Sequence, residues 1–529
     1  MTTRRTIPIA LLTMVFAMGC EGTIGEGGRT EPGTDPMDPR FEARVWRLSP
    51  PQLELEIERL FGPEAPAPNV PPGAAEYGLT NIAATGRIDT GNAGLFVEGI
   101  RAVGEWAATN GATAARCDSY GTDACIDQFM GWFPEAAFRG PVTDDEITEL
   151  RMVFEQNRTD YDYDYGFASV VRAVLLSPRF LYRWELGEPG NDDAIVDLDP
   201  YEIANLMAFS ITDRAPDDEL LAAAAAGELD EPDVREAHAR RLMDRSDAVW
   251  QRFFWEWLEM ATLQSQGNEV GLPPSLVAQM EEEYQTFVSN VVVENRGTLR
   301  DLLTSDQTWA QPELAEYYGV SHPGSGLQPI TMDASQRSGL LTQGAWLVAH
   351  GKDGRANVVR RGMAVFRDAM CRNVTPLDID LEAALDELVG PDATVREIVV
   401  ARGEAPTCGA CHRLADPIGL AFEGFAGDGS WQTTYAADGN PVETNINFPG
   451  AGEIDGATDL SQILADDQAF RSCLVQRFAH FLMGGQVGSP EIVRWTGEAD
   501  QAFLASGGNF EELLVDLVRD PAFIERRKP

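Results

Sequence analysis

The pattern of apolar positions predicts a chain built mainly of amphipathic helices. In "WRLSPPQLELEIERLFG", Leu53, Ile57 and Leu60 recur at helical spacing behind two prolines that suit the start of a helix. In "LDPYEIANLMAFSI", Asp199 can cap a helix and Glu202, three residues later, can reach back to the cap. Both segments are therefore predicted to form helices.

Two further segments show how the predicted helices end and what they bury. The unit "PDDELLAAAAAGEL" starts with acidic residues, which suit the positive end of a helix dipole, and stops at Gly227. The segment "WQRFFWEWLEM" repeats Trp250, Phe253, Phe254 and Trp257 at helical spacing, which favours a buried core face over a cofactor site. The segment "FRSCLVQRFAHFLMGG" ends on paired glycines, as helices often do.

A strand pattern stands out in "WQTTYAADGNPVETNINF", where Asp438 and Gly439 indicate the turn of a hairpin. The expected fold class is therefore mainly α: a multi-domain helical protein with a small β-hairpin next to a CxxCH motif. We expect a signal peptide (1–19), a lipid anchor and flexible tether (20–40), an N-terminal helical module (41–115), a short helical module (116–160), a central helical domain (161–305), a CxxCH-bearing module (306–455) and a C-terminal helical module (456–529).

The composition narrows the class of partner. The 529 residues are 44% hydrophobic, enough for substantial cores, and carry a formal net charge of -43. Such a charge repels nucleic-acid phosphates and anionic lipid headgroups, so we expect no nucleic-acid partner. It favours a protein partner with a basic docking face, although a surface charge that only maintains solubility explains it equally well.

The first twenty residues, "MTTRRTIPIALLTMVFAMGC", predict an export signal. Two arginines precede an apolar run that is too short to span a bilayer as a mature helix, and small residues precede Cys20. The ending resembles a bacterial lipoprotein processing site, which implies lipidation of Cys20 and anchoring by acyl chains; ordinary secretion is the alternative. Glu21 then favours the periplasmic side of the outer membrane or the cell surface.

Cysteine usage fits an oxidising compartment. The seven cysteines are Cys20, Cys117, Cys125, Cys371, Cys408, Cys411 and Cys473. Without the predicted lipid anchor and the CxxC pair, four remain, which allow three pairings. We favour Cys117 with Cys125, across a loop rich in turn formers, and Cys371 with Cys473, across the flanks of the CxxCH region. The alternative is that these four are free buried thiols.

The pentapeptide "CGACH" predicts covalent haem. Two thiols at this spacing reach the vinyl groups of the porphyrin, and a histidine directly after the second thiol lies under the iron. Cys408 and Cys411 would form the thioethers of haem c, and His412 would be the proximal iron ligand. Zinc would need two more ligands, and a histidine next to a ligating cysteine suits the same tetrahedron poorly. A thioredoxin-like dithiol lacks its βαβ setting here.

The sixth position of such an iron separates electron transfer from chemistry on a bound molecule. The remaining histidines are His238, His322, His350 and His480, each more typical of a structural side chain than of a ligand. Met483 is the methionine candidate, because it lies downstream of the motif at a predicted helix end, although a core role is its ordinary one.

The run "TCGACHRLADPIGLAFEGF", with the pattern CxxCHxxxDPIGxxxExF, resembles a module of large exported bacterial proteins. These are assembled from domains of unknown function numbered in the fifteen-eighties and fifteen-nineties. Other blocks are similar in the same order, including "DYDYGFASVVRAVLLSPRFLYRWELGEP" and "SGLLTQGAWLVAHGKDGRANVVRRGMAVF". The resemblance implies a cytochrome-c-like protein and supports the pairing of Cys371 with Cys473. It also implies His350, which precedes the step Arg361-Gly362, as the first choice for the sixth ligand.

These observations predict an exported, lipid-anchored c-type cytochrome-like protein with one covalent haem, which exchanges electrons with another redox protein of the cell envelope. Two alternatives stay open. One is a haem enzyme of peroxidase or oxidase type with an open iron position, and the other is a structural or binding lipoprotein without haem.

Overall fold

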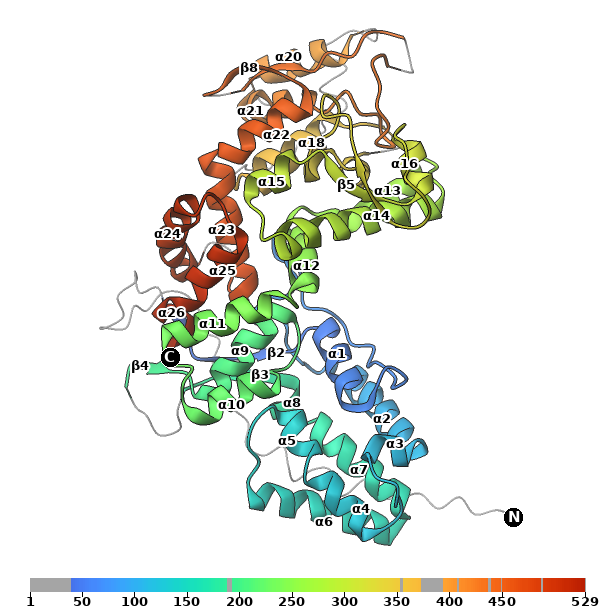
Figure 1. The fold of residues 1–529 in the computed structure, drawn as a ribbon, viewed down its shortest axis with the longest axis vertical. Helices are drawn as coiled ribbons and strands as arrows, with labels where there is room; N and C mark the ends of the chain where they lie inside the picture. Colours follow the sequence, from blue (N-terminus) through green and yellow to red (C-terminus); the bar gives the residue numbers. More distant parts are fainter. Residues whose placement is uncertain are drawn as a thin grey trace. The chain divides into compact units, whose positions relative to one another are not determined.

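The computed structural model describes residues 40–187, 193–352, 355–372, 393–406, 409–435, 439–448, 450–486 and 489–528. In this part of the chain the fold is mainly α, and the strands form small sheets of two or three (Figure 1). The predicted fold class is confirmed. The predicted signal peptide and Cys20 lie outside the described residues. No described helix is both long and apolar enough to cross a membrane.

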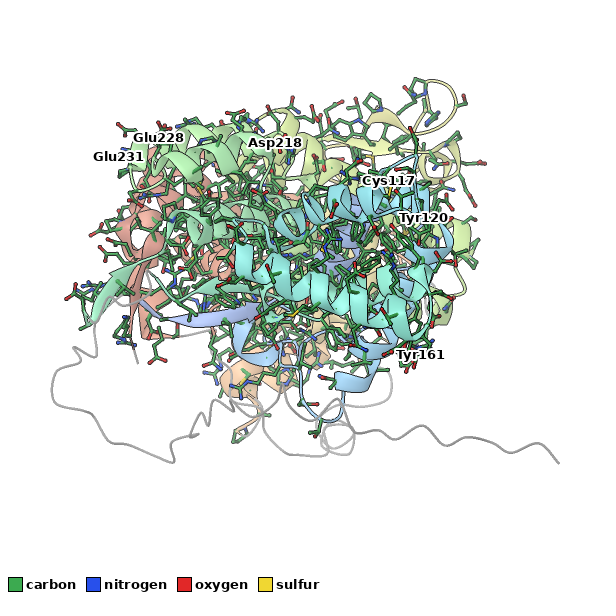
Figure 2. The ribbon with its side chains drawn as sticks, turned by 90° about the horizontal axis from the view of Figure 1, so that it is seen from below. Cys117, Tyr120, Tyr161, Asp218, Glu228 and Glu231 are labelled. Carbon is green, nitrogen blue, oxygen red and sulfur yellow. A yellow bond between two sulfur atoms is a disulfide. The ribbon has the colours of Figure 1, made fainter. Side chains whose placement is uncertain are left out.

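The α-helices between residues 48 and 181 share one buried apolar cluster, to which the short η1 does not contribute. Phe129 stacks on Phe133 at 4.5 Å and also contacts Phe167 of α7, and α7 packs along α2 and α6. The disulfide between Cys117 and Cys125 closes the loop that contains Tyr120 (Figure 2). This cluster is continuous across the boundaries expected after residues 115 and 160. The helices are α1 (Pro50–Phe61), η1 (Ala83–Thr85), α2 (Ala93–Thr109), α3 (Gly111–Ala115), α4 (Asp123–Met130), α5 (Phe133–Phe138), α6 (Asp144–Asp160), α7 (Tyr163–Leu175) and α8 (Pro178–Leu181).

The start of α9 and the end of α10 lie where the sequence predicts them. Asp199 and Glu202 form a capping box at the start of α9, and Gly227 ends α10 in the left-handed conformation. The aromatic face of α12 is buried, and Trp250 stacks on Phe478 of α23 with the ring centroids 4.2 Å apart. These helices are α9 (Pro200–Thr212), α10 (Asp218–Ala226), α11 (Pro232–Met243), α12 (Asp247–Trp257), η2 (Met260–Thr262), α13 (Leu263–Glu269), α14 (Pro274–Val288), η3 (Ser289–Glu294), α15 (Leu299–Thr304) and α16 (Pro312–Tyr317).

The remaining helices include those that carry the CxxCH region. The predicted stop at paired glycines is confirmed, because α23 ends at Gly484, which has φ 57°. The helices are η4 (Leu340–Thr342), α17 (Gly344–Ala349), α18 (Val358–Met363), η5 (Ala364–Ala369), α20 (Val395–Glu404), α21 (Gly409–Leu420), α22 (Gly456–Asp466), α23 (Gln468–Met483), α24 (Pro490–Ala505), α25 (Phe510–Arg519) and α26 (Pro521–Ile524).

The strands form short pairs and one three-stranded sheet. In that sheet β9 lies between β1, to which it is parallel, and β4, to which it is antiparallel. The pairs β2–β3, β5–β6 and β7–β8 are antiparallel. The strands are β1 (Phe41–Glu42), β2 (Arg44–Arg47), β3 (Tyr182–Glu185), β4 (Ile195–Asp197), β5 (Gln307–Ala310), β6 (Gln328–Thr331), β7 (Asn445–Phe448), β8 (Gly452–Asp455) and β9 (Glu525–Arg527).

A hairpin does lie against α21, as predicted, but its regular strands come later than the sequence suggested. Around the predicted turn, Thr434 and Pro441 form only an isolated bridge, and Asp438 lies outside the described residues. The strands β7 and β8 follow, and β7 is the one that contacts α21.

Candidate functional site

The second half of the CxxCH motif lies at the start of α21, which packs beside α18 and α20 (Figure 1). The crossing with α18 is very close. A β-carbon at Gly419 would lie 1.9 Å from the carbonyl oxygen of Val358, and one at Gly362 would lie 2.2 Å from that of Ala415. Both glycines occur in the sequence blocks that resemble the family, and they permit direct contact between the two backbones.

His412 is held by a buried carboxylate. Its Nδ1 lies 2.9 Å from Oδ1 of Asp416, whose side chain is 0% exposed, and Oδ2 of Asp416 lies 3.1 Å from Nε of Arg402. A carboxylate paired with arginine accepts hydrogen bonds, so Nδ1 of His412 carries the proton and donates it. The lone pair of the imidazole is then on Nε2, the arrangement that a metal ligand needs.

Cys411 precedes His412 and is a half-buried, free thiol, while Cys408 lies outside the described residues. The donor set that the structure describes, one accessible thiol and one imidazole with a fixed tautomer, fits covalent haem. Among the described residues there is no group of three or more His, Cys, Asp or Glu side chains arranged to hold a metal ion.

His350, which follows the last residue of α17, is a second histidine with an available ring nitrogen. Its Nδ1 donates to the carbonyl oxygen of Trp346 at 2.9 Å, and its ring stacks on the Trp346 ring at 4.6 Å. Its Nε2 is buried and has no hydrogen-bond partner. Burial lowers the pKa of His350 to about 4, so the imidazole is neutral and the lone pair of Nε2 is free.

The structure places the two candidate ligands toward opposite ends of α21. Trp346, which stacks on His350, contacts Phe422 at 4.8 Å, and Phe422 follows the C-terminal end of α21. His412 lies in the first turn of the helix, roughly 12 Å away along its axis at 1.5 Å per residue. The two imidazoles are therefore not brought together across one site.

Arg361 fastens the end of α17 to the turn that follows α21, a role that the sequence did not reveal. Its guanidinium is fully buried and donates to the carbonyl oxygens of Leu347, Phe422, Phe425 and Ala426 at 2.7 to 3.1 Å. Burial lowers the pKa of Arg361 to about 10, which leaves it charged at neutral pH. Four backbone carbonyl oxygens thus accept hydrogen bonds from the two terminal nitrogens of one buried cation, while its Nε has no partner among the described residues.

The other candidate ligands have neighbours of their own. Nδ1 of His238 lies 3.2 Å from Arg241, and the ring nitrogens of His322 and His480 lie next to backbone carbonyl oxygens. Met483 is fully buried at the end of α23, and its carbonyl oxygen accepts a hydrogen bond from Arg44 of β2. Met483 therefore packs beside the N-terminal strands.

The structure pairs Cys371 with Cys473 and Cys117 with Cys125, which are the pairings that the sequence favoured. The first of these joins the chain after η5 to α23. Because η5 continues α18, which crosses α21, the disulfide ties the C-terminal helices to the support of the motif helix.

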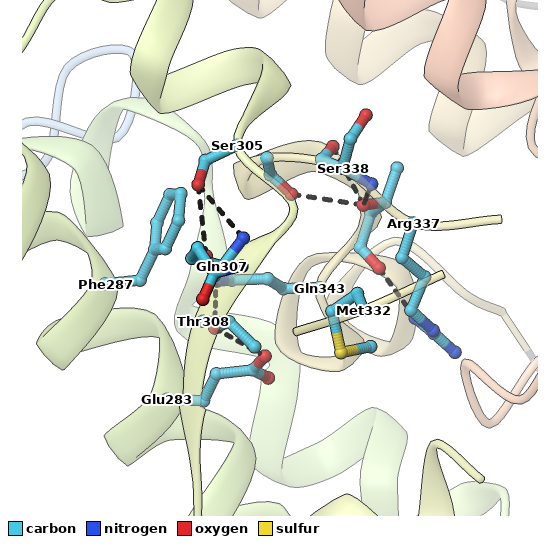
Figure 3. Close-up of a pocket in the computed structure, with 11 residues that line it drawn as sticks. Glu283, Phe287, Ser305, Gln307, Thr308, Met332, Arg337, Ser338 and Gln343 are labelled. Atoms are coloured by element: carbon cyan, nitrogen blue, oxygen red, sulfur yellow. Dashed lines mark hydrogen bonds between the residues drawn. The ribbon is translucent and has the colours of Figure 1, made fainter. Parts of the chain in front are cut away.

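A buried polar network around Glu283 of α14 was not predicted (Figure 3). Thr308 donates to Oε1 of Glu283 at 2.9 Å, and Tyr318 donates to Oε2 at 2.5 Å. Burial raises the pKa of Glu283 to about 7. A cavity of about 10 Å³, the size for one water, adjoins Gln343 and Ser338. Its residues come from separate elements, so no sequence spacing indicated it.

Three family models match the chain in succession. PSD5, described as Protein of unknown function (DUF1595), matches residues 125–185, and PSD4, Protein of unknown function (DUF1592), matches residues 198–320. PSCyt3, Protein of unknown function (DUF1588), matches residues 337–435, which include α17, α18 and the CxxCH helix. No curated protein and no solved structure gives a match. The chain therefore contains the DUF1595, DUF1592 and DUF1588 domains in that order, and these three are domains of the cytochrome-c-like series.

Proposed function

We propose that this protein is a c-type cytochrome in which Cys408 and Cys411 attach one haem and His412 is the proximal iron ligand. One observation carries the proposal: Nδ1 of His412 lies 2.9 Å from the buried carboxylate of Asp416, which orients the imidazole of the residue that follows the free thiol of Cys411. Bound haem supplies a one-electron redox couple. Cys408, Cys411 and His412 would hold it, and Asp416 would orient the imidazole.

The proposed setting is the cell envelope, with lipid on Cys20 as the anchor. The redox partner is a protein with a basic docking face, because the net charge of -43 attracts cationic surfaces and repels anionic ones. Exposed carboxylates such as Asp218, Glu228 and Glu231 lie at the surface of α10 and the loop that follows it (Figure 2). Association should therefore weaken as ionic strength rises.

Of the two candidates for the sixth iron position, His350 has the more available donor atom, but it would have to move closer to His412 than the structure places it. Nε2 of His350 is buried without a hydrogen-bond partner, which costs free energy unless the atom gains a ligand. Met483 is packed beside β2 and fills a core position there.

A haem enzyme of peroxidase or oxidase type is the second candidate, and the separation of His350 from the first turn of α21 favours it. In that case the sixth position is open. Carbon monoxide binding to the reduced protein separates the two functions. Slow binding that becomes fast in His350→Ala supports electron transfer, whereas fast binding in both proteins supports the haem enzyme.

The proposal is tested with protein made in a periplasm that is competent for haem attachment. Haem should remain on the protein after acid-acetone extraction, since thioether bonds do not dissociate. The double variant Cys408→Ser/Cys411→Ser should lose the haem, and the matched control Cys117→Ser should keep it. Complete extraction of haem from the wild type would overturn the proposal.

A further inference from the structure

The carboxylate of Asp416 touches the nitrogen of His412 that faces away from the proposed iron. We propose that Asp416 is a positioning residue that raises electron donation by His412 and so lowers the midpoint potential of the haem. This inference rests on the proposed haem function. Arg402 is the counter-charge that limits the effect.

The geometry places the carboxylate for this role. His412 and Asp416 are four residues apart on α21 and therefore lie on one face of the helix, where Nδ1 and Oδ1 are 2.9 Å apart. The side chain of Asp416 is 0% exposed, so water does not screen its charge from the imidazole. Its other oxygen, Oδ2, is 3.1 Å from Nε of Arg402, whose side chain is 9% exposed. The guanidinium of Arg402 therefore lies against the same carboxylate that contacts His412.

A carboxylate that accepts the Nδ1 proton has two effects on a ligating histidine. It fixes the tautomer and the orientation of the ring, and it makes the other nitrogen a stronger base. A more basic ligand stabilises the oxidised iron more than the reduced iron, so the reduction potential falls. Arg402 partly neutralises the same carboxylate and therefore makes the fall in reduction potential smaller.

The test is spectroelectrochemical titration of the full chain with its haem. Asp416→Asn keeps an oxygen that can accept the Nδ1 proton but removes the charge. At a fixed ambient potential the ratio of reduced to oxidised haem should rise about tenfold, which equals a shift of about 59 mV for one electron. The matched control is Glu404→Gln, which removes a negative charge from an exposed position at the end of α20, and its effect should be less than half as large.

A second pair of variants decides the question if Asp416→Asn does not retain haem. Arg402→Gln removes the counter-charge, so the carboxylate of Asp416 acts on His412 alone. The ratio of reduced to oxidised haem should then fall. Arg413→Gln is its control, because it removes a positive charge from an exposed side chain next to His412 in the sequence.

The inference is overturned if neither site variant shifts the ratio more than its control does, while haem stays attached. Absence of covalent haem from the wild type overturns the proposed function instead, so the two failures are distinguishable.

Discussion

Replacing Gly419 by alanine places a methyl group in the crossing between α18 and α21. The new β-carbon would lie 1.9 Å from the carbonyl oxygen of Val358 and 2.7 Å from its carbonyl carbon, where ordinary contact begins at 3.4 Å. Both atoms belong to the backbone, so no side chain can rotate away to make room. Arg361 of α18 also binds four carbonyl oxygens, which resists a shift of that helix.

The loss in the free energy of unfolding follows from the movement that separates the two helices. Overpacking of a well-filled core commonly costs about 1 to 3 kcal/mol. Relief here requires two backbones to move apart, so we expect a loss of about 3 kcal/mol or more in the free energy of unfolding. The helix propensity of alanine opposes this by only about 0.5 to 1 kcal/mol.

The matched control is Gly497→Ala in α24, where a β-carbon would meet nothing within 4 Å. This variant should gain about 1 kcal/mol or less from helix propensity. Urea unfolding followed by circular dichroism compares the variants, and hydrogen exchange of peptides from residues 355–372 and 409–425 shows whether the loss is local to the crossing. If Gly419→Ala were as stable as the control, the close contact between the helices would be refuted.

Three further predictions concern the disulfide, the anchor and a buried histidine. Replacing Cys371 and Cys473 together by serine should cost about 4 to 5 kcal/mol in the chain-entropy model, since 102 residues separate them; an unchanged urea midpoint would contradict this. Cys20→Ala should move the protein from the membrane fraction to the supernatant, and a variant that still pellets after a salt wash would disprove the anchor. Burial, with Arg477 nearby, lowers the pKa of His480 to about 3, so the folded state keeps it neutral and stability falls as pH drops below the unfolded value of 6.5. His480→Gln should remove up to about 1.4 kcal/mol per pH unit from that slope, and equal slopes between pH 6.5 and 5 would argue against the buried neutral imidazole.

Features that depend on neighbours in the sequence were predictable. The capping box at Asp199 and the helix stops at Gly227 and Gly484 follow from hydrogen bonds and backbone conformations within a few residues. The core face of α12 follows from its helical period. In each case the residues that form the cap, the helix stop or the buried face are the same residues whose pattern in the sequence predicts it.

Features that depend on the approach of distant segments were not predictable. The glycines at the crossing of α18 and α21 lie in no local pattern that indicates a close contact. A residue without a side chain is required there because the backbone of the other helix lies so near. The pairing of His412 with Asp416 was accessible in principle, because a spacing of four places them on one face once the motif is known to start a helix. That start was not predicted, so the carboxylate was missed.

The strand order β1–β9–β4 has a consequence for how the chain is made. Strand β9 lies in the middle of its sheet, yet it follows almost all of the described chain, so β1 and β4 have no sheet partner until the ribosome has released β9. Closing such distant pairs is slow, because a long loop must be ordered before any contact forms. We therefore expect this sheet to be among the last parts of the described fold to form.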